Sequence, residues 1–178
     1  MTMTPSNIEI SNEHEFAVDE ARLRQAAMQV LAQHDYATDA ELTIVITTND
    51  QVQGLNAQFR GVDTPTDVLS FPSEEADEDV MEGELLYLGD ILIAYPYALA
   101  QAEREGHDPM DSFALLVVHG VLHLLGYDHD TPENRAEMWE VQAEALEALN
   151  IPTGIVPVLE EASHGDEPAD TGAADDDQ

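Results

Sequence analysis

The sequence contains neither lysine nor cysteine, and arginine, at five residues, is its only strongly basic residue type. Without cysteine the chain can form no disulfide, no iron–sulfur cluster and no cysteine-type zinc finger. Without lysine it can form no lysine Schiff base. Against the five arginines stand 38 acidic residues, which gives a formal net charge of −33. This balance excludes a polybasic nucleic-acid binder as a description of the whole molecule, and also electrostatic docking to anionic lipid.

Long apolar runs are absent as well. The longest, residues 113–125, is interrupted by His119, Gly120 and His123. It falls short of the roughly 20 residues that a membrane-spanning helix needs. Residues 1–20 show no basic segment followed by an apolar one, so no signal peptide is visible. We therefore expect a cytoplasmic protein that does not enter a membrane, and the hydrophobic content of 43% indicates a folded core.

The acidic residues are concentrated in two segments. Seven lie in residues 74–84, where we expect a solvated loop, and eight lie in residues 160–178, which have no large apolar side chain. The length of 178 residues fits one domain. We therefore predict a single folded domain over residues 1–157 and an acidic disordered tail over residues 158–178.

Helical and β-strand patterns alternate along the domain. Apolar residues at helical spacing predict helices over residues 19–34, 49–59, 96–105, 113–125 and 132–149. β-branched and apolar segments predict extended strands over residues 42–48, 67–71 and 85–94, the last with a bulge at Gly89 and Asp90. Together these elements predict an α+β fold, a small mixed β-sheet packed with helices in a single domain.

Capping residues indicate where several of these helices begin and end. Asn49 or Asp50 can cap the second helix, and Asp111 or Ser112 can cap the apolar helix over residues 113–125. Gly126 follows that helix, at the position where a residue with left-handed backbone conformation commonly ends a helix. The sequence Thr131-Pro132-Glu133 is a strong start for the last helix.

Residues 119–129 read HGVLHLLGYDH and hold three of the seven histidines. His119 and His123 are four residues apart on the predicted helix, so both imidazoles lie on one face and suit a single cation. Gly126 turns the chain back, which allows His129 to supply a third imidazole. Three neutral imidazoles leave one position of a zinc ion open, as in catalytic sites. We predict one zinc ion per chain at this helix and the following turn, with nickel, iron or copper as other metals that accept imidazole.

The same spacing occurs in metzincin peptidases, which have a glutamate directly after the first histidine as general base. In this chain that position is Gly120, which can transfer no proton. Because loss of a positioned base lowers a rate by about 10²–10⁴-fold, peptidase chemistry of this kind is disfavoured. Two ordinary core histidines would also be hard to explain on so apolar a helix, since each buried ring needs partners for both nitrogens.

The motif HGVLHLLGYDH resembles the signature of the YbeY family of bacterial metal-dependent endoribonucleases. Residues 56–72, NAQFRGVDTPTDVLSFP, resemble the family's second motif, which has an asparagine, an arginine and then PTDVLSFP. Residues 88–91, LGDI, resemble its third. The order and spacing of the motifs match over about residues 42–150, which is most of the chain.

This resemblance implies an endonuclease that cuts single-stranded RNA, matures the 3′ end of small-subunit ribosomal RNA and takes part in ribosome quality control. It implies a ribosomal particle or assembly proteins as partners, and it gives no indication of a DNA substrate. By motif position, His119, His123 and His129 match the zinc ligands, and Arg60 matches an arginine that is important for function.

The residue chemistry agrees with these roles. Zinc polarises phosphoryl oxygens and lowers the pKa of bound water, and the Arg60 guanidinium can bind phosphate oxygens with two donors. Asp67 could buttress Arg60, or could simply join a turn to a strand. Asp90 could orient a ligand imidazole, or could be a bulge residue. Tyr127 and Trp139 are candidate surfaces for base stacking, although we expect Trp139 to pack in the core.

Three functions therefore stay open from the sequence. They are a zinc endoribonuclease of ribosome assembly, a metallohydrolase of another substrate, and a zinc-containing assembly factor with little nuclease activity. The net charge is a difficulty for the first, because proteins normally gain affinity for RNA by neutralising phosphates. Any RNA-binding surface must be a local one at Arg60 and the metal, with the substrate presented by a ribosomal particle or the repulsion screened by salt.

Overall fold

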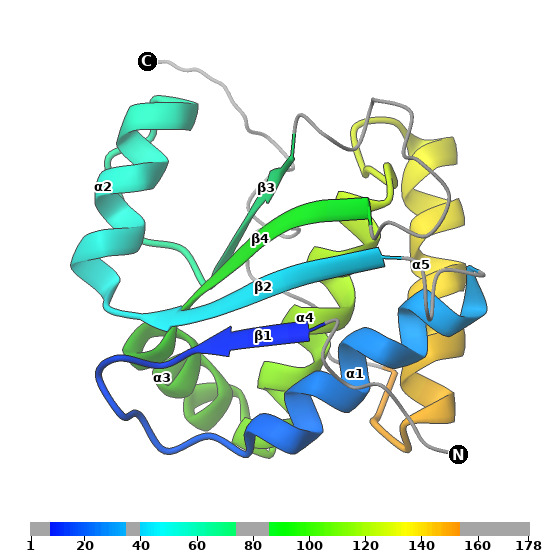
Figure 1. Ribbon diagram of the computed structural model, residues 1–178, viewed down its shortest axis with the longest axis horizontal. Helices are drawn as coiled ribbons and strands as arrows, with labels where there is room; N and C mark the ends of the chain where they lie inside the picture. The colour runs from blue at the N-terminus through cyan, green and yellow to red at the C-terminus, as the bar shows by residue number, and fades with distance from the viewer. Residues whose placement is uncertain (1–7, 35–39, 74–85, 154–178) are drawn as a thin grey trace.

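The computed structural model describes residues 8–34, 40–73 and 86–153 (Figure 1). The acidic segment over residues 74–84, the predicted tail over residues 158–178 and the predicted domain end at residue 157 lie outside the described residues. The described elements are, in chain order, β1 Ile8–Ser11, α1 Glu20–Gln33, β2 Ala40–Thr47, α2 Asn49–Arg60, β3 Val68–Pro72, β4 Leu86–Ala94, α3 Tyr95–Glu105, α4 Pro109–Leu124 and α5 Pro132–Ala148.

The described strands form a mixed four-stranded sheet in the order β1-β2-β4-β3. β1, β2 and β4 are parallel, whereas β3 is antiparallel to β4 and ends the sheet. The β2–β4 register shifts between Glu41 and Leu42, which leaves Leu88 as the extra residue of a bulge next to the predicted position. A Cβ at Gly89 would lie 2.3 Å from the backbone oxygen of Phe71, so only glycine fits here.

Helices cover both faces of the sheet (Figure 1). α4 packs against β3 and β4 and also contacts α1, α3 and α5. Consecutive residues of β3 point to opposite faces: Val68 joins the main core with α1, α4 and α5, whereas Leu69 joins a smaller cluster with Val52 of α2. α2 therefore lies across the sheet from α4, and β3, the last strand, lies between the two helices.

The predicted α+β class, with a small mixed sheet and a central apolar helix, is confirmed. The predicted start of that helix is wrong, because α4 begins at Pro109 and its N-cap is Asp108, whose side chain accepts from the backbone N–H groups of Met110 and Asp111. The predicted cap of α2 is also wrong. Thr48 fills that position and accepts from the N–H of Gln51.

β1 was not predicted. It is four residues long and only Ile8 in it is buried, so it carries too little apolar pattern to be recognised without its parallel partner β2. None of the helices that the structure describes combines the length and apolarity that a membrane crossing requires.

Candidate metal centre and adjoining cleft

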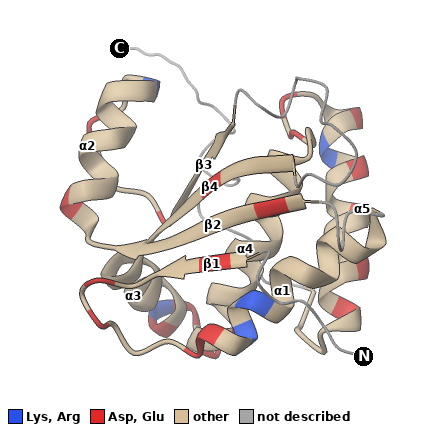
Figure 2. Ribbon diagram, in the orientation of Figure 1, with Lys and Arg blue, Asp and Glu red and all other residues tan. Residues whose placement is uncertain are grey.

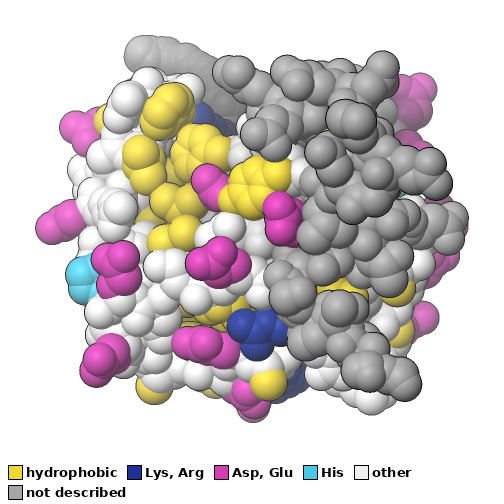
Figure 3. Space-filling model, in the orientation of Figure 1, with side chains coloured by type: hydrophobic (Ala, Val, Ile, Leu, Met, Phe, Trp, Pro, Cys, Tyr) yellow, Lys and Arg dark blue, Asp and Glu magenta, His cyan; other side chains and the backbone are white. Residues whose placement is uncertain are grey.

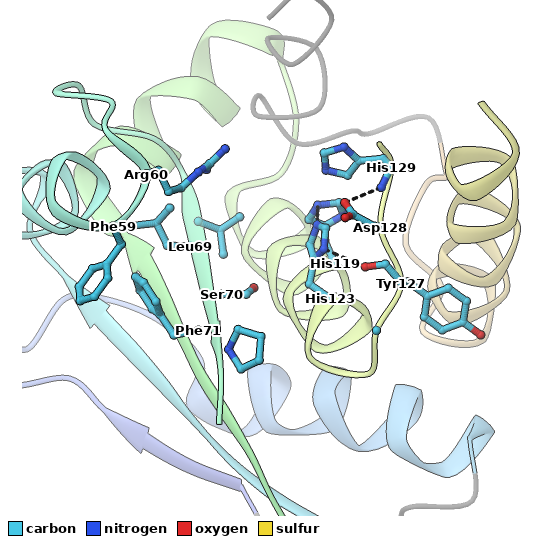
Figure 4. A pocket seen from close by; sticks show the side chains of 13 residues that line it. Phe59, Arg60, Leu69, Ser70, Phe71, His119, His123, Tyr127, Asp128 and His129 are labelled. Atoms are coloured by element: carbon cyan, nitrogen blue, oxygen red, sulfur yellow. Dashed lines mark hydrogen bonds between the residues drawn. The ribbon is translucent and has the colours of Figure 1, made fainter. Parts of the chain in front are cut away.

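The three histidines of residues 119–129 converge at the C-terminal end of α4 (Figure 4). One ring nitrogen each of His119, His123 and His129 lies within 4.8 Å of the others. α4 places the first two one turn apart, with ring centroids separated by 4.6 Å. Gly126, with a φ of +106°, then turns the chain so that the His129 ring lies 5.1 Å from that of His123.

Hydrogen bonds fix where two of these rings carry their protons. His119 Nδ1 lies 2.9 Å from Gln142 Oε1, and His123 Nδ1 lies 3.0 Å from the backbone oxygen of Tyr127. Because both oxygens only accept, each Nδ1 carries a hydrogen and donates it. In the neutral rings both Nε2 atoms then present lone pairs, and they lie 3.1 Å apart. Two lone pairs that lie so close together suit a cation held between the two nitrogens.

Burial keeps both rings neutral. It lowers the pKa of His119, which is 1% exposed, to about 4. Burial, followed by the neighbouring imidazoles, lowers the pKa of His123 to about 3. Two nitrogens bound to tetrahedral zinc would lie about 3.3 Å apart, close to the observed 3.1 Å, so the three histidines could hold a metal ion.

Gln142 is the partner of this centre that the sequence did not predict. It lies in α5, is 3% exposed and accepts the Nδ1 hydrogen of His119. Such outer partners fix the tautomer and orientation of a ligand imidazole. The only sequence signal was a polar residue on the buried face of α5, which it shares with Met138, Ala145 and Leu146.

Gln142→Leu is expected to weaken metal affinity by about 10- to 100-fold, because His119 loses the acceptor that orients it. Leucine is similar in size, so the variant should fold. Competition for the metal against a chelating dye measures the change. Gln142→Glu keeps an acceptor at this position and should retain most of the affinity. Wild-type affinity in the leucine variant would contradict this role.

Gly120 lies beside the metal centre, where α4 packs against Ile91 of β4. A Cβ at this position would lie 2.9 Å from Cγ2 of Ile91. Only glycine fits without displacing Ile91. A side chain at the position that carries the glutamate of metzincin peptidases would therefore require Ile91 to move.

Gly120→Ala is expected to lower the free energy of unfolding by about 1–3 kcal/mol, because the added methyl group overpacks against Ile91. Gly54→Ala makes the same chemical change in α2, where a Cβ would meet nothing within 4 Å. It should raise the free energy of unfolding by about 0.5–1 kcal/mol, since alanine favours a helix interior. Urea unfolding compares the two. Equal stability of both variants would show that Ile91 moves aside without an energetic cost, which would contradict the predicted overpacking.

A cleft of about 540 Å³ joins the histidines to the end of α2 (Figure 4). The five residues of β3 line its middle. Phe59 and Arg60 lie on the α2 side, and the three histidines with residues 126–128 lie on the α4 side. The Arg60 guanidinium points across the cleft toward the histidines.

Arg60 is the last residue of α2 and precedes Gly61, whose φ of +73° ends the helix. Its side chain is exposed, and within the described residues it has no hydrogen bond or ion pair. It is also the only Lys or Arg among the described residues that line the cleft. Figure 2 shows that Lys and Arg are few and that Asp and Glu are many on the described elements. At this end of α2 it shows a single basic segment.

The two aspartates suggested as supporting residues do not line the cleft. Asp67 is 2% exposed just before β3, and the Thr66 hydroxyl donates to it at 3.3 Å. Asp90, in β4, accepts from the Tyr87 hydroxyl. The Nδ1 hydrogens of the two α4 histidines go instead to the glutamine of α5 and to the backbone of the turn.

The two aromatic candidates from the sequence, Tyr127 and Trp139, contact residues next to or within the histidine centre. The Trp139 ring is partly buried against the core, with its centroid 5.9 Å from that of His129. The Tyr127 hydroxyl lies 3.0 Å from Nε2 of His34, whose Nδ1 donates to the backbone oxygen of Val30. His34 is therefore half-buried and anchors the turn that carries the Tyr127 oxygen.

Fold and site together define a small α+β protein with three histidines arranged to hold a metal ion beside an arginine-containing cleft. The family model described as "Endoribonuclease YbeY" matches residues 8–150. The chain belongs to the YbeY family.

Relatives and a solved structure agree with this membership. The protein from Chloroflexus aurantiacus named "Endoribonuclease YbeY" is 43% identical over 148 residues, which are 82% of this chain and 96% of the relative. The one from Pelotomaculum thermopropionicum, with the same name, is 45% identical over 138 residues, 76% of this chain and 91% of the relative. The solution structure of TM1509 from Thermotoga maritima is similar with a TM-score of 0.55 and 28% identity, covering 84% of this chain and 96% of that one.

Proposed function

We propose that this protein is a zinc-dependent endoribonuclease that cuts single-stranded RNA, with one zinc ion per chain. The observation that carries the proposal is a three-histidine centre that faces an exposed arginine across one cleft. Two groups that stabilise negative charge, placed on either side of one space, suit a phosphodiester bond between them. The names of the family and of its relatives support the same activity.

Each side of the cleft has its own part in the reaction. His119, His123 and His129 would hold the zinc ion, which when bound polarises phosphoryl oxygens and lowers the pKa of water. Gln142 keeps the His119 imidazole in the tautomer that offers Nε2 to the metal. Arg60 binds the non-bridging oxygens of the phosphate with two parallel donors and stabilises the charge that develops on them.

We infer that the substrate is the 3′ region of small-subunit ribosomal RNA, presented by a ribosomal particle or by assembly proteins. The net charge of −33 and the single arginine of the cleft support presentation, because long-range attraction cannot concentrate free RNA at this surface. Maturation of the 3′ end and ribosome quality control are the roles that fit such a substrate.

The test compares the cleavage of a single-stranded RNA by the wild-type protein, His119→Ala and Arg60→Glu. The wild type should cut, and both variants should lose activity. An RNA that carries the small-subunit 3′ end should be compared with an unrelated strand and with a duplex. Equal cleavage by all three proteins would indicate a contaminating nuclease and favour a zinc-containing assembly factor instead.

A further inference from the structure

Phe59 is the most exposed large hydrophobic side chain among the described residues. Its side chain is 59% exposed, followed by Val62 with 43%. The space-filling view shows hydrophobic side chains gathered on the face that carries α2 (Figure 3). An aromatic ring that is mostly in water at the rim of a cleft contributes little to the core, and its face is available to a molecule that enters the cleft.

The ring is nevertheless held in place. It contacts Phe71 of β3 with ring centroids 5.3 Å apart and planes inclined by 67°. The end of α2 is fixed by the backbone N–H of Val62, which donates to the Asn56 oxygen, and by the Asn56 side chain, which donates to the Thr64 oxygen. A tilted ring contact leaves much of the Phe59 surface available to a planar partner.

Phe59 and Arg60 are adjacent in sequence and face different parts of the same cleft. Figure 4 shows the Arg60 guanidinium pointing toward the histidines, while the rings of Phe59 and Phe71 lie beyond Leu69 on the far side of β3. All of them line the cleft. A strand bound at Arg60 therefore lies in the same cleft that Phe59 borders.

We propose that Phe59, supported by Phe71, stacks an unpaired base of single-stranded RNA next to the phosphate that is cut. The inference rests on the proposed function and deepens it by assigning a base-binding residue. Arg60 and the metal can bind only a few phosphates, so contacts that do not depend on charge add to the affinity for RNA. Base–aromatic stacking is such a contact, and every base can make it.

Stacking on Phe59 also explains why the cleft would bind single-stranded RNA in preference to a duplex. In a duplex each base is already paired and stacked between its neighbours, so it cannot lie flat on a protein ring unless it is unstacked first. A single strand can turn out one base at little cost. Phe59 would thus act as a substrate-binding residue.

The test measures the binding of a fluorescently labelled ten-nucleotide RNA over a series of salt concentrations. Phe59→Ala should weaken binding by about 5- to 100-fold, the loss expected for one base–aromatic stack, with the salt slope unchanged. Phe59→Trp should bind as the wild type does. Val62→Ala removes nearby exposed apolar surface without an aromatic face, and it should change the affinity less than about twofold.

Two further results separate this inference from the proposed function. An RNA of the same length with abasic nucleotides should bind wild type and Phe59→Ala equally weakly. Wild-type affinity of Phe59→Ala for the normal RNA, or an equal loss in Phe59→Ala and Val62→Ala, would overturn the stacking role while RNA cleavage by the wild type still supported the nuclease. A wild type that neither binds nor cuts RNA would overturn both.

Discussion

His119→Ala is expected to lower the bound zinc from about one ion per chain to near zero and to abolish RNA cleavage. Among the described residues, these imidazoles form the only group of three or more His, Asp or Glu ligands that lie within 4.8 Å of one another. Two remaining imidazoles cannot complete the three-ligand set that holds a catalytic zinc ion. Metal analysis after gel filtration, together with a cleavage assay, measures both effects.

His14→Ala is the matched control for this experiment. It removes an exposed histidine from the loop before α1 and should leave the zinc content and the activity unchanged. Because His119 is buried and its replacement could disturb packing, His123→Ala provides an independent loss of one ligand. Circular dichroism should show a folded chain in each case. One zinc ion per chain in both ligand variants would refute the centre at these histidines.

The histidine centre could be predicted because its geometry is local. An interval of four residues on a helix fixes the relation between His119 and His123, and a glycine just after the helix allows the chain to bring His129 back. Neither feature depends on distant parts of the chain. The same holds for α1, which apolar residues at helical spacing predict and whose buried residues are Leu23, Ala26, Ala27, Val30 and Leu31.

The surroundings of the centre could not be predicted, because they are set by packing between elements. Gln142 meets His119 across the contact between α5 and α4, 23 residues further along the chain. Asp90 was a candidate from the sequence to orient a ligand imidazole, but its place in β4 directs its carboxylate to the Tyr87 hydroxyl. Phe59 looks like a core residue in its apolar helical pattern. Only the position of α2 beside the last strand of the sheet shows that its ring is exposed.

Arg60→Gln is expected to lower kcat/KM for RNA cleavage by about 10²–10³-fold while leaving the zinc content and the stability unchanged. The magnitude is that of removing one donor that stabilises charge in a transition state. The side chain is exposed, so its replacement costs no packing. Arg60→Lys keeps the charge but loses the fork of two parallel donors, and it should recover only part of the activity.

Arg104→Gln is the control that distinguishes the effect of the position of Arg60 from the effect of losing one positive charge. Arg104 also lies in the last turn of a helix that a left-handed glycine ends, but this helix is α3 and Arg104 does not line the cleft. Each substitution removes one positive charge from a chain of net charge −33, so general repulsion of RNA rises equally in both. Only Arg60→Gln should lose activity beyond a few fold. Equal losses would mean that net charge, and not a guanidinium opposite the three histidines, limits cleavage.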